Sequence, residues 1–216
     1  LDERVFQLAL HKHQWLGLER AEVVTALANM VYGVLHKHNP WAFSRTQMDE
    51  WLDTPRYTKH AAAIADLFTQ RFHPDPTRSL PRGAPESFER AATALKGQLR
   101  RDVECESALM LLERMLDAVS ATYRTNLFMP DRYALSLRVD PRAVMTPAEQ
   151  REKEVPFGVF FVSGRRFNGF HCRFRDIARG GMRIVTPGTS EQVAIENARA
   201  FDEAYGLAFA QQLKNK

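Results

Sequence analysis

Cysteine is scarce in this 216-residue sequence, which contains only Cys105 and Cys172. Two cysteines are too few for a disulfide framework or a cysteine-based metal site, and they favour a reducing, cytoplasmic compartment. Long apolar runs are also missing: no stretch approaches the roughly 20 uncharged apolar residues of a membrane span, so we expect no membrane partner. Glycine and proline number 11 each, which excludes collagen-like and low-complexity classes. The start at Leu1 lacks the features of a signal peptide, and both ends suggest a piece of a longer chain.

The common catalytic motifs are missing as well. The sequence has no Gly-x-Ser-x-Gly, no phosphate-binding P-loop and no Gly-x-Gly-x-x-Gly followed by an acid. The tripeptide His-Lys-His occurs twice, at residues 11–13 and 36–38. Side chains two positions apart on a helix point about 200° away from each other, so neither pair can bind one metal ion. We therefore predict no metal site and expect these histidines to be exposed at helix ends.

The net charge of +4 is concentrated in the second part of the sequence. Residues 1–125 contain 16 basic and 16 acidic residues, whereas residues 126–216 contain 14 and 10. Between residues 165 and 183 a single acid, Asp176, stands among six arginines: Arg165, Arg166, Arg173, Arg175, Arg179 and Arg183. Arginine suits the bidentate recognition of carboxylate or phosphate, so we expect an anionic ligand here. A solvated, arginine-rich strand face is the alternative interpretation.

Apolar residues at helical spacing run through the first 125 residues. They predict helices over about residues 19–38, 58–72, 87–101 and 109–123, with a proline-rich loop over 74–85. Tyr123 is the last apolar position of the fourth stripe. We expect all four stripes to face a hydrophobic core.

After Pro130 the period changes to the alternation that is typical of strands. Strands are predicted over residues 133–139, 159–162 and 167–175, with a turn at Ser163-Gly164. The third strand has two chemically different faces. One face is apolar, with Phe170, Cys172 and Phe174, and the other is cationic, with His171, Arg173 and Arg175.

The remaining segments complete the predicted architecture. Residues 142–154 are polar and predict a loop, residues 179–183 are expected to interrupt the strand pattern, and residues 189–213 predict a final helix. Helices come first and strands follow, so the predicted class is α+β. We expect an N-terminal helical region followed by a mixed β-sheet with a packed C-terminal helix.

The segment around two adjacent glycines has the composition of an anion site. Gly180 and Gly181 let a ligand approach the backbone closely, and Arg179 directly precedes them. Exposed backbone amides beside a fork-shaped cation can bind a small carboxylate. A glycine-rich turn with its arginines in solvent is the other reading of this spacing.

The whole stretch from Phe170 to Arg183, FHCRFRDIARGGMR, resembles the substrate-domain signature of the large NAD-specific glutamate dehydrogenases. Similar stretches support the resemblance, which is strong from about residue 120 onward; they are Arg124–Phe128, Ala134–Pro141, Pro156–Phe161 and Phe209–Lys214. The resemblance implies a substrate-binding domain beginning at residue 123, after a helical region over residues 1–122.

The resemblance also implies roles for individual residues. Arg179 stands where shorter glutamate dehydrogenases have a lysine that holds the side-chain carboxylate of glutamate, and Gly180 and Gly181 match the glycine pair. Gln211 and Lys214 match the family's Gln-x-x-Lys, which contacts the α-carboxylate. The family's catalytic lysine and its NAD-binding Rossmann domain would follow Lys216, so no catalytic residue is expected in this chain.

We therefore predict a fragment of an NAD-dependent glutamate dehydrogenase that anchors L-glutamate or 2-oxoglutarate. The fragment alone should be inactive, and the full-length enzyme should be a homo-oligomer. Two alternatives stay open: a dehydrogenase of another amino acid, and a non-catalytic module that binds nucleic acid or another anion. Nucleic acid is disfavoured because Phe170 and Phe174 are out of phase with Arg173 and Arg175, so no base could stack beside the cations.

Overall fold

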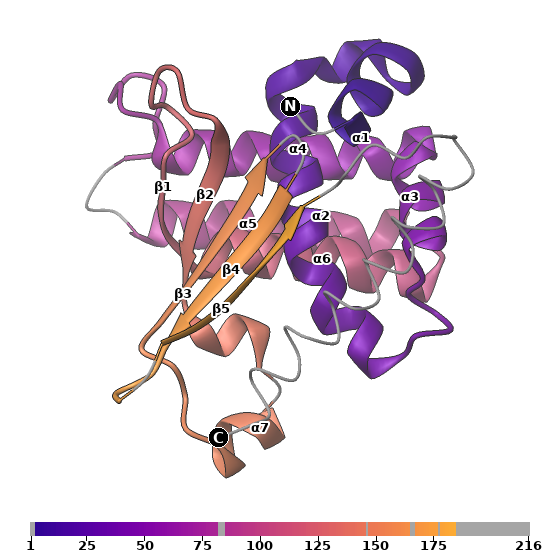
Figure 1. Cartoon of the computed structure of the whole chain (residues 1–216). Coiled ribbons are helices and arrows are strands. Elements are labelled where there is room, and N and C mark those ends of the chain that lie inside the picture. The colour runs from indigo at the N-terminus through magenta and orange to yellow at the C-terminus, as the bar shows by residue number, and fades with distance from the viewer. Residues whose placement is uncertain (1–2, 82–84, 146, 165–166, 177, 185–216) are drawn as a thin grey trace.

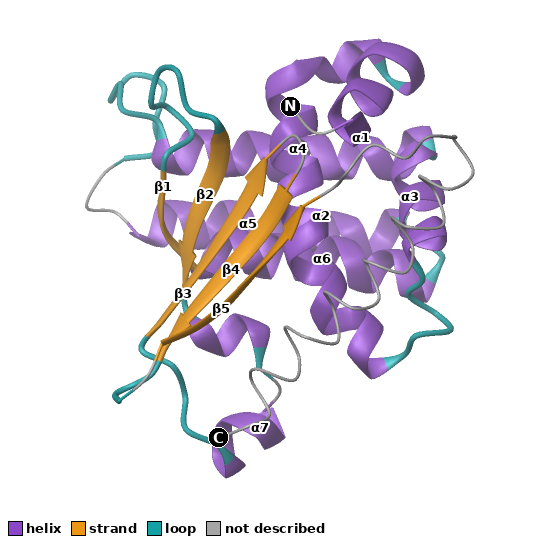
Figure 2. Ribbon diagram, in the orientation of Figure 1, coloured by secondary structure: helices purple, strands orange, loops and turns teal. Residues whose placement is uncertain are grey.

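The computed structural model describes most of the chain as helices packed on one face of a β-sheet (Figure 1; Figure 2). The described residues are 3–81, 85–145, 147–164, 167–176 and 178–184. The helices α2, α5 and α6 lie behind the sheet in the view of Figure 2. This arrangement confirms the α+β class. The helix predicted over residues 189–213 lies outside the described residues.

Six α-helices precede the sheet in the described part of the chain. The first, α1 (Glu3–Phe6), continues into a π-helical turn (Gln7–Lys12) and a 3-10 turn (Gln14–Leu16). The others are α2 (Gly17–His38), α3 (Arg45–Asp53), α4 (Pro55–Phe72), α5 (Pro85–Asp102) and α6 (Glu106–Ala121). The four helices predicted from apolar stripes are confirmed as α2, α4, α5 and α6.

The structure also contains helical segments that the sequence analysis did not predict. These are the turns before α2, and α3, which begins because the Ser44 hydroxyl accepts a hydrogen bond from the backbone N–H of Gln47 at 3.2 Å. At the other end of the region, α6 ends two residues earlier than expected. Thr122 already has extended backbone, and its hydroxyl bonds the carbonyl of Ala118 at 2.7 Å. Tyr123 therefore lies on a strand and is 53% exposed, so its prediction as a core position of a helix was wrong.

The sheet has five strands in the order β1-β2-β3-β4-β5. They are β1 (Thr122–Thr125), β2 (Ala134–Val139), β3 (Gly158–Gly164), β4 (Phe167–Arg173) and β5 (Ala178–Ile184). Every neighbouring pair among the described strands is antiparallel, whereas a mixed sheet was expected. Each strand pairs with the strand that follows it in the sequence, and the long connection over residues 140–157 also returns the chain antiparallel.

Three local predictions in this region were wrong. Ser163 and Gly164 belong to β3 and both pair with β2, and Ser163 also pairs with β4, so they do not form the turn. Residues 142–154 are not all loop: they include most of a 3-10 turn (Pro141–Val144), which the Asp140 carboxylate caps by accepting from the Arg142 N–H at 3.0 Å, and α7 (Pro147–Glu152). Residues 179–183 do not interrupt the sheet but form the centre of β5.

The apolar face of the sheet and the helices share one hydrophobic cluster. Leu137, Phe161 and Phe170 contribute to it from three adjacent strands, and α2 packs against β2 and β3. Phe68 of α4 and Leu112 of α6 are among its fully buried side chains. The cluster holds the back of the sheet in a fixed position, and no helix among the described residues covers the other face of the sheet in Figure 2.

Among the described residues, no helix combines the length and the apolarity that crossing a bilayer demands.

Candidate functional site

The arginine-rich run forms a β-hairpin, and its register decides which residues lie together. Arg173 pairs with Ala178, Cys172 with Arg179, and His171 with Gly180. The Arg-Gly-Gly segment is therefore part of β5, at the edge of the described sheet. Of the six arginines of the run, Arg173 lies on β4, Arg175 in the turn, and Arg179 and Arg183 on β5, whereas Arg165 and Arg166 lie outside the described residues.

The two faces predicted for β4 are confirmed. Phe170, Cys172 and Phe174 are buried, whereas His171, Arg173 and Arg175 are exposed (the burial pattern follows the strand alternation). Since alternate residues of a strand point to opposite faces, the cationic group belongs to the face that the described helices do not cover.

Arg179 and Gly180 take neighbouring positions in two different cross-strand rows. Arg179 is in register with Cys172 of β4. Cys172 pairs with Val159 of β3, and Val159 pairs with Val139 of β2; these three partners are all buried. Gly180 is in register with exposed His171. On β5, at the edge of the described sheet, the backbone of Arg179 therefore continues a row of buried residues and that of Gly180 continues a row of exposed ones.

Gly180 has a steric reason to be glycine. A Cβ atom at this position would lie 2.7 Å from the backbone carbonyl oxygen of Phe170 and 3.3 Å from Cδ2 of His171. A carbon–oxygen approach of this length is shorter than van der Waals contact, and the oxygen belongs to the backbone of a paired strand, so it cannot move away as a side chain could. The sequence analysis explained the glycine by access for a ligand; the structure adds the tight contact between β4 and β5.

Gln211 and Lys214, the residues expected to contact the α-carboxylate, lie outside the described residues.

Neither cysteine has the surroundings of a nucleophile. Cys172 is fully buried between apolar neighbours, and burial raises its pKa to about 11, so its thiol stays protonated near neutral pH. Cys105 is half-buried and precedes α6 without capping it through its side chain. Both are free thiols in this structure.

The histidines of the two His-Lys-His repeats were expected to be exposed, and for two of them this prediction was wrong. His13 is buried, with its Nε2 atom 3.1 Å from both the hydroxyl of Thr58 and the backbone carbonyl of Asp53. His36 is buried too, and its Nδ1 lies 3.0 Å from the carbonyl of Phe43. Tertiary contacts supply hydrogen-bond partners for both rings, which makes their burial acceptable.

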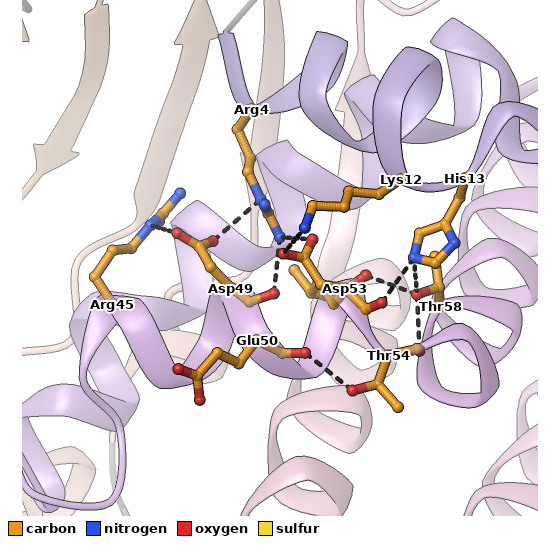
Figure 3. Close-up of polar contacts among 10 residues, drawn as sticks. Arg4, Lys12, His13, Arg45, Asp49, Glu50, Asp53, Thr54 and Thr58 are labelled. Carbon is orange, nitrogen blue, oxygen red and sulfur yellow. Dashed lines mark hydrogen bonds and ion pairs between the residues drawn. The ribbon is translucent and has the colours of Figure 1, made fainter. Parts of the chain in front are cut away.

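A charged cluster lies beside His13 and connects the first described turns of the chain to α3 (Figure 3). Arg4 contacts Asp49 at 3.2 Å and Asp53 at 2.9 Å, and Lys12 lies 3.7 Å from Asp53. Both carboxylates are therefore paired with cations from the N-terminal turns. In the described part of the chain, no group of three or more histidine, cysteine or acidic side chains is arranged to hold a metal ion.

Comparison with known proteins places this hairpin in a family. Residues 96–216, more than half of the chain, match the model of the bacterial NAD-glutamate dehydrogenase catalytic domain. The chain belongs to this family. The match begins within α5 and includes α6, all five strands and the Arg-Gly-Gly segment.

Individual glutamate dehydrogenases are also similar to this family member. The NAD-specific glutamate dehydrogenase of Saccharomyces cerevisiae is 44% identical over 108 residues, which cover 50% of this chain and 10% of the relative. Glutamate dehydrogenase 2 of Dictyostelium discoideum is 42% identical over 115 residues, 53% of this chain and 10% of the relative. The NAD-specific enzyme of Neurospora crassa is 40% identical over 122 residues, 56% and 11% respectively. The chain spans about a tenth of the length of these relatives.

The described residues of this family member do not form a binding site of the kind that NAD requires. Dinucleotides bind at the end of a parallel strand–helix–strand unit with a glycine-rich turn. The described strands are all antiparallel, and the sequence has no such glycine motif. We therefore assign no step of hydride transfer to residues of this chain.

Proposed function

We propose that this chain is the substrate-anchoring part of an NAD-dependent glutamate dehydrogenase, which converts L-glutamate, NAD and water to 2-oxoglutarate, ammonia and NADH. The observation that carries the proposal is the family match over residues 96–216, which includes the Arg-Gly-Gly segment. The named relatives are NAD-specific glutamate dehydrogenases, and this supports both the substrate and the cofactor. NAD is bound, in this proposal, by a domain outside this chain.

The proposed roles follow from the two carboxylates of glutamate. Arg179 binds the γ-carboxylate, beside the backbone of Gly180 and Gly181, and Lys214 and Gln211 bind the α-carboxylate. A substrate with an acid at each end requires a cation at each end, because a carboxylate that leaves water without a partner costs several kcal/mol.

The same proposal covers the organisation of the protein. A helical region over residues 1–122 precedes the start of the substrate domain over residues 123–216, and the full-length enzyme assembles as a homo-oligomer. Two free thiols and no disulfide between them support a reducing, cytoplasmic compartment. The catalytic lysine and the nucleotide-binding domain lie beyond Lys216, so the 216-residue chain alone has no dehydrogenase activity.

Replacement of Arg179 in the full-length enzyme tests the anchoring role. Arg179→Leu should lower kcat/KM for glutamate roughly 30-fold to several thousand-fold, since removal of one partner of a desolvated charge pair costs about 2–5 kcal/mol. Arg179→Lys should keep most of the activity because the charge remains. Arg175→Leu, at an exposed position of the same hairpin, is the matched control and should change kcat/KM less than about threefold.

The substrate L-norvaline, which lacks the γ-carboxylate, separates anchoring from a general loss of function. Arg179→Leu should improve the ratio of norvaline to glutamate turnover, whereas a misfolded enzyme would lose both. If Arg179→Leu turned over glutamate as well as Arg175→Leu does, the proposed role of Arg179 would be wrong, and a dehydrogenase of another amino acid would be favoured.

A further inference from the structure

The open face of the sheet carries a cross-strand row that no linear stretch of the sequence contains. Arg124 pairs with Arg138, Arg138 with Phe160, Phe160 with His171, and His171 with Gly180. The row therefore crosses all five strands. Apart from half-buried Phe160, its members are exposed. Adjacent strands lie 4.7–4.9 Å apart, so Arg124 and His171 are roughly 14 Å apart across the sheet.

Arg173 extends this surface along β4, two residues from His171 and about 6.6 Å further along the strand. The four side chains Arg124, Arg138, His171 and Arg173 are called the cationic face below. Gly180 and Ala178, opposite the last two on β5, add no long side chain, so the cationic face is open toward that edge.

The cations of this face differ from most arginines elsewhere in the protein because they have no acidic partner among the described residues. On the helices, Arg4, Arg20 and Arg100 each form an ion pair with an aspartate or glutamate. The nearest acid by register, Asp140 at the end of β2, is already bonded to Arg142 and to the Tyr123 hydroxyl. Arg124 and Arg138 even stand directly opposite each other, an arrangement of like charges that destabilises a strand pair.

Aromatic rings contact three of the four side chains of the cationic face. The Arg138 guanidinium lies 5.7 Å from the centroid of the Phe160 ring, and the His171 ring lies 6.2 Å from it. Arg173 lies 5.7 Å from the ring of Phe157. Stacking restricts the side chains before any ligand binds, so binding an anion costs less side-chain entropy. The sequence analysis missed these contacts because both rings come from β3 and the segment before it.

We propose that the cationic face docks an acidic helix of a second polypeptide. The charges extend over about 14 Å, which is too wide for one small anion but matches about three turns of helix with a carboxylate on each turn. Helices are also the usual cover for an open sheet face. A nucleic acid would need bases to stack, yet Phe160 is occupied by Arg138 and His171.

A binding experiment with defined peptides tests this docking surface on the intact 216-residue chain. The probe is a fluorescein-labelled helical peptide of about 15–20 alanine, leucine and glutamate residues with one glutamate per turn, measured by fluorescence anisotropy. A second peptide has glutamine in place of every glutamate. The double variant Arg138→Glu, Arg173→Glu should raise the Kd for the acidic peptide about tenfold or more, and added salt should weaken binding to the unchanged chain.

The matched control is Arg90→Glu, which reverses an equally exposed charge on α5, on the other side of the sheet. It reverses one charge where the double variant reverses two, and it should change the Kd less than about twofold. The milder double variant Arg138→Gln, Arg173→Gln should also weaken binding, and it serves if charge reversal disturbs the fold, as judged by circular dichroism.

Three results would overturn the proposal. Saturable binding of the acidic peptide could be absent. The Arg138 and Arg173 variants could bind it as tightly as Arg90→Glu does, or the glutamine peptide could bind equally well. Finally, a single-stranded DNA of similar charge could compete with the acidic peptide at lower concentration and lose affinity in the same variants, in which case the surface binds nucleic acid.

Discussion

One ion pair connects the helices to the sheet, and its removal should have an unusual pH dependence. Arg132, in the loop before β2, pairs with Glu22 of α2, a residue 110 positions earlier in the sequence. The two side chains are only 20% and 14% exposed. Burial raises the pKa of the Glu22 carboxyl above its ordinary value, and Arg132 opposes this effect. The substitution Arg132→Met would leave the carboxylate buried without its cation.

The expected loss of stability follows from this burial. Removal of one partner of a fully buried pair costs about 3–5 kcal/mol, and the residual exposure here reduces the expected value to about 2–3 kcal/mol. That is roughly a 30- to 150-fold change in the unfolding equilibrium and about 5–10 °C in Tm for a chain of this size. Because the folded-state pKa of Glu22 is raised, the carboxyl favours the folded protein below its ordinary pKa. This contribution is lost as the pH rises, so the cost of Arg132→Met should be largest near pH 8 and shrink toward pH 4.

Urea unfolding followed by circular dichroism at several pH values measures this effect. The control is Arg20→Met, which breaks a well-formed pair of α2 with Asp66 at 2.6 Å, where both side chains are more than 40% exposed. That variant should lose less than about 1 kcal/mol, with little dependence on pH. Adding Glu22→Gln to Arg132→Met should recover much of the stability. Equal losses for Arg132→Met and Arg20→Met, or a loss at pH 5 as large as at pH 8, would refute the reasoning.

Three further outcomes are expected from the structure. Hydrogen bonds from Arg142 lower the pKa of the Asp140 carboxyl to about 2. This carboxylate therefore stabilises the folded protein above its ordinary pKa, and the contribution is lost as the pH falls toward 2. Asp140→Asn should flatten the acid limb of a plot of Tm against pH. Gly180→Ala should lower stability by about 1–3 kcal/mol, because its Cβ would lie 2.7 Å from a carbonyl oxygen of β4. Gly97→Ala, within α5 and with its nearest neighbour at 3.5 Å, should instead raise stability by about 0.5–1 kcal/mol. Thermal unfolding compares the two variants. Iodoacetamide should alkylate half-buried Cys105 but not buried Cys172 in the native protein, giving one adduct by intact mass, and two after denaturation; two native adducts would contradict the burial of Cys172.

Local periodicity was sufficient to predict much of this protein. The apolar stripes of α4, α5 and α6 repeat every three or four residues, and burial of one helix face depends mainly on that spacing; α2, by contrast, is buried on all sides from residue 23 to 36, which its stripe did not predict. The two faces of β4 were equally predictable, because alternate residues of any strand point to opposite sides. The unusual sequence around Gly180 also identified the family, since its glycine pair, arginines and neighbours form one continuous stretch.

Features that depend on segments meeting in space were decided only by the tertiary structure. Whether residues 179–183 form a strand depends on β4 lying beside them to supply hydrogen bonds, which outweighs the strand-weakening effect of two glycines. His13 could be buried because Asp53 and Thr58, 40 and 45 residues away in the sequence, provide its partners. A sequence records spacing along the chain, but hydrogen bonds, ion pairs and rows of charge form between neighbours in space, and which neighbours meet is determined by how the whole core packs.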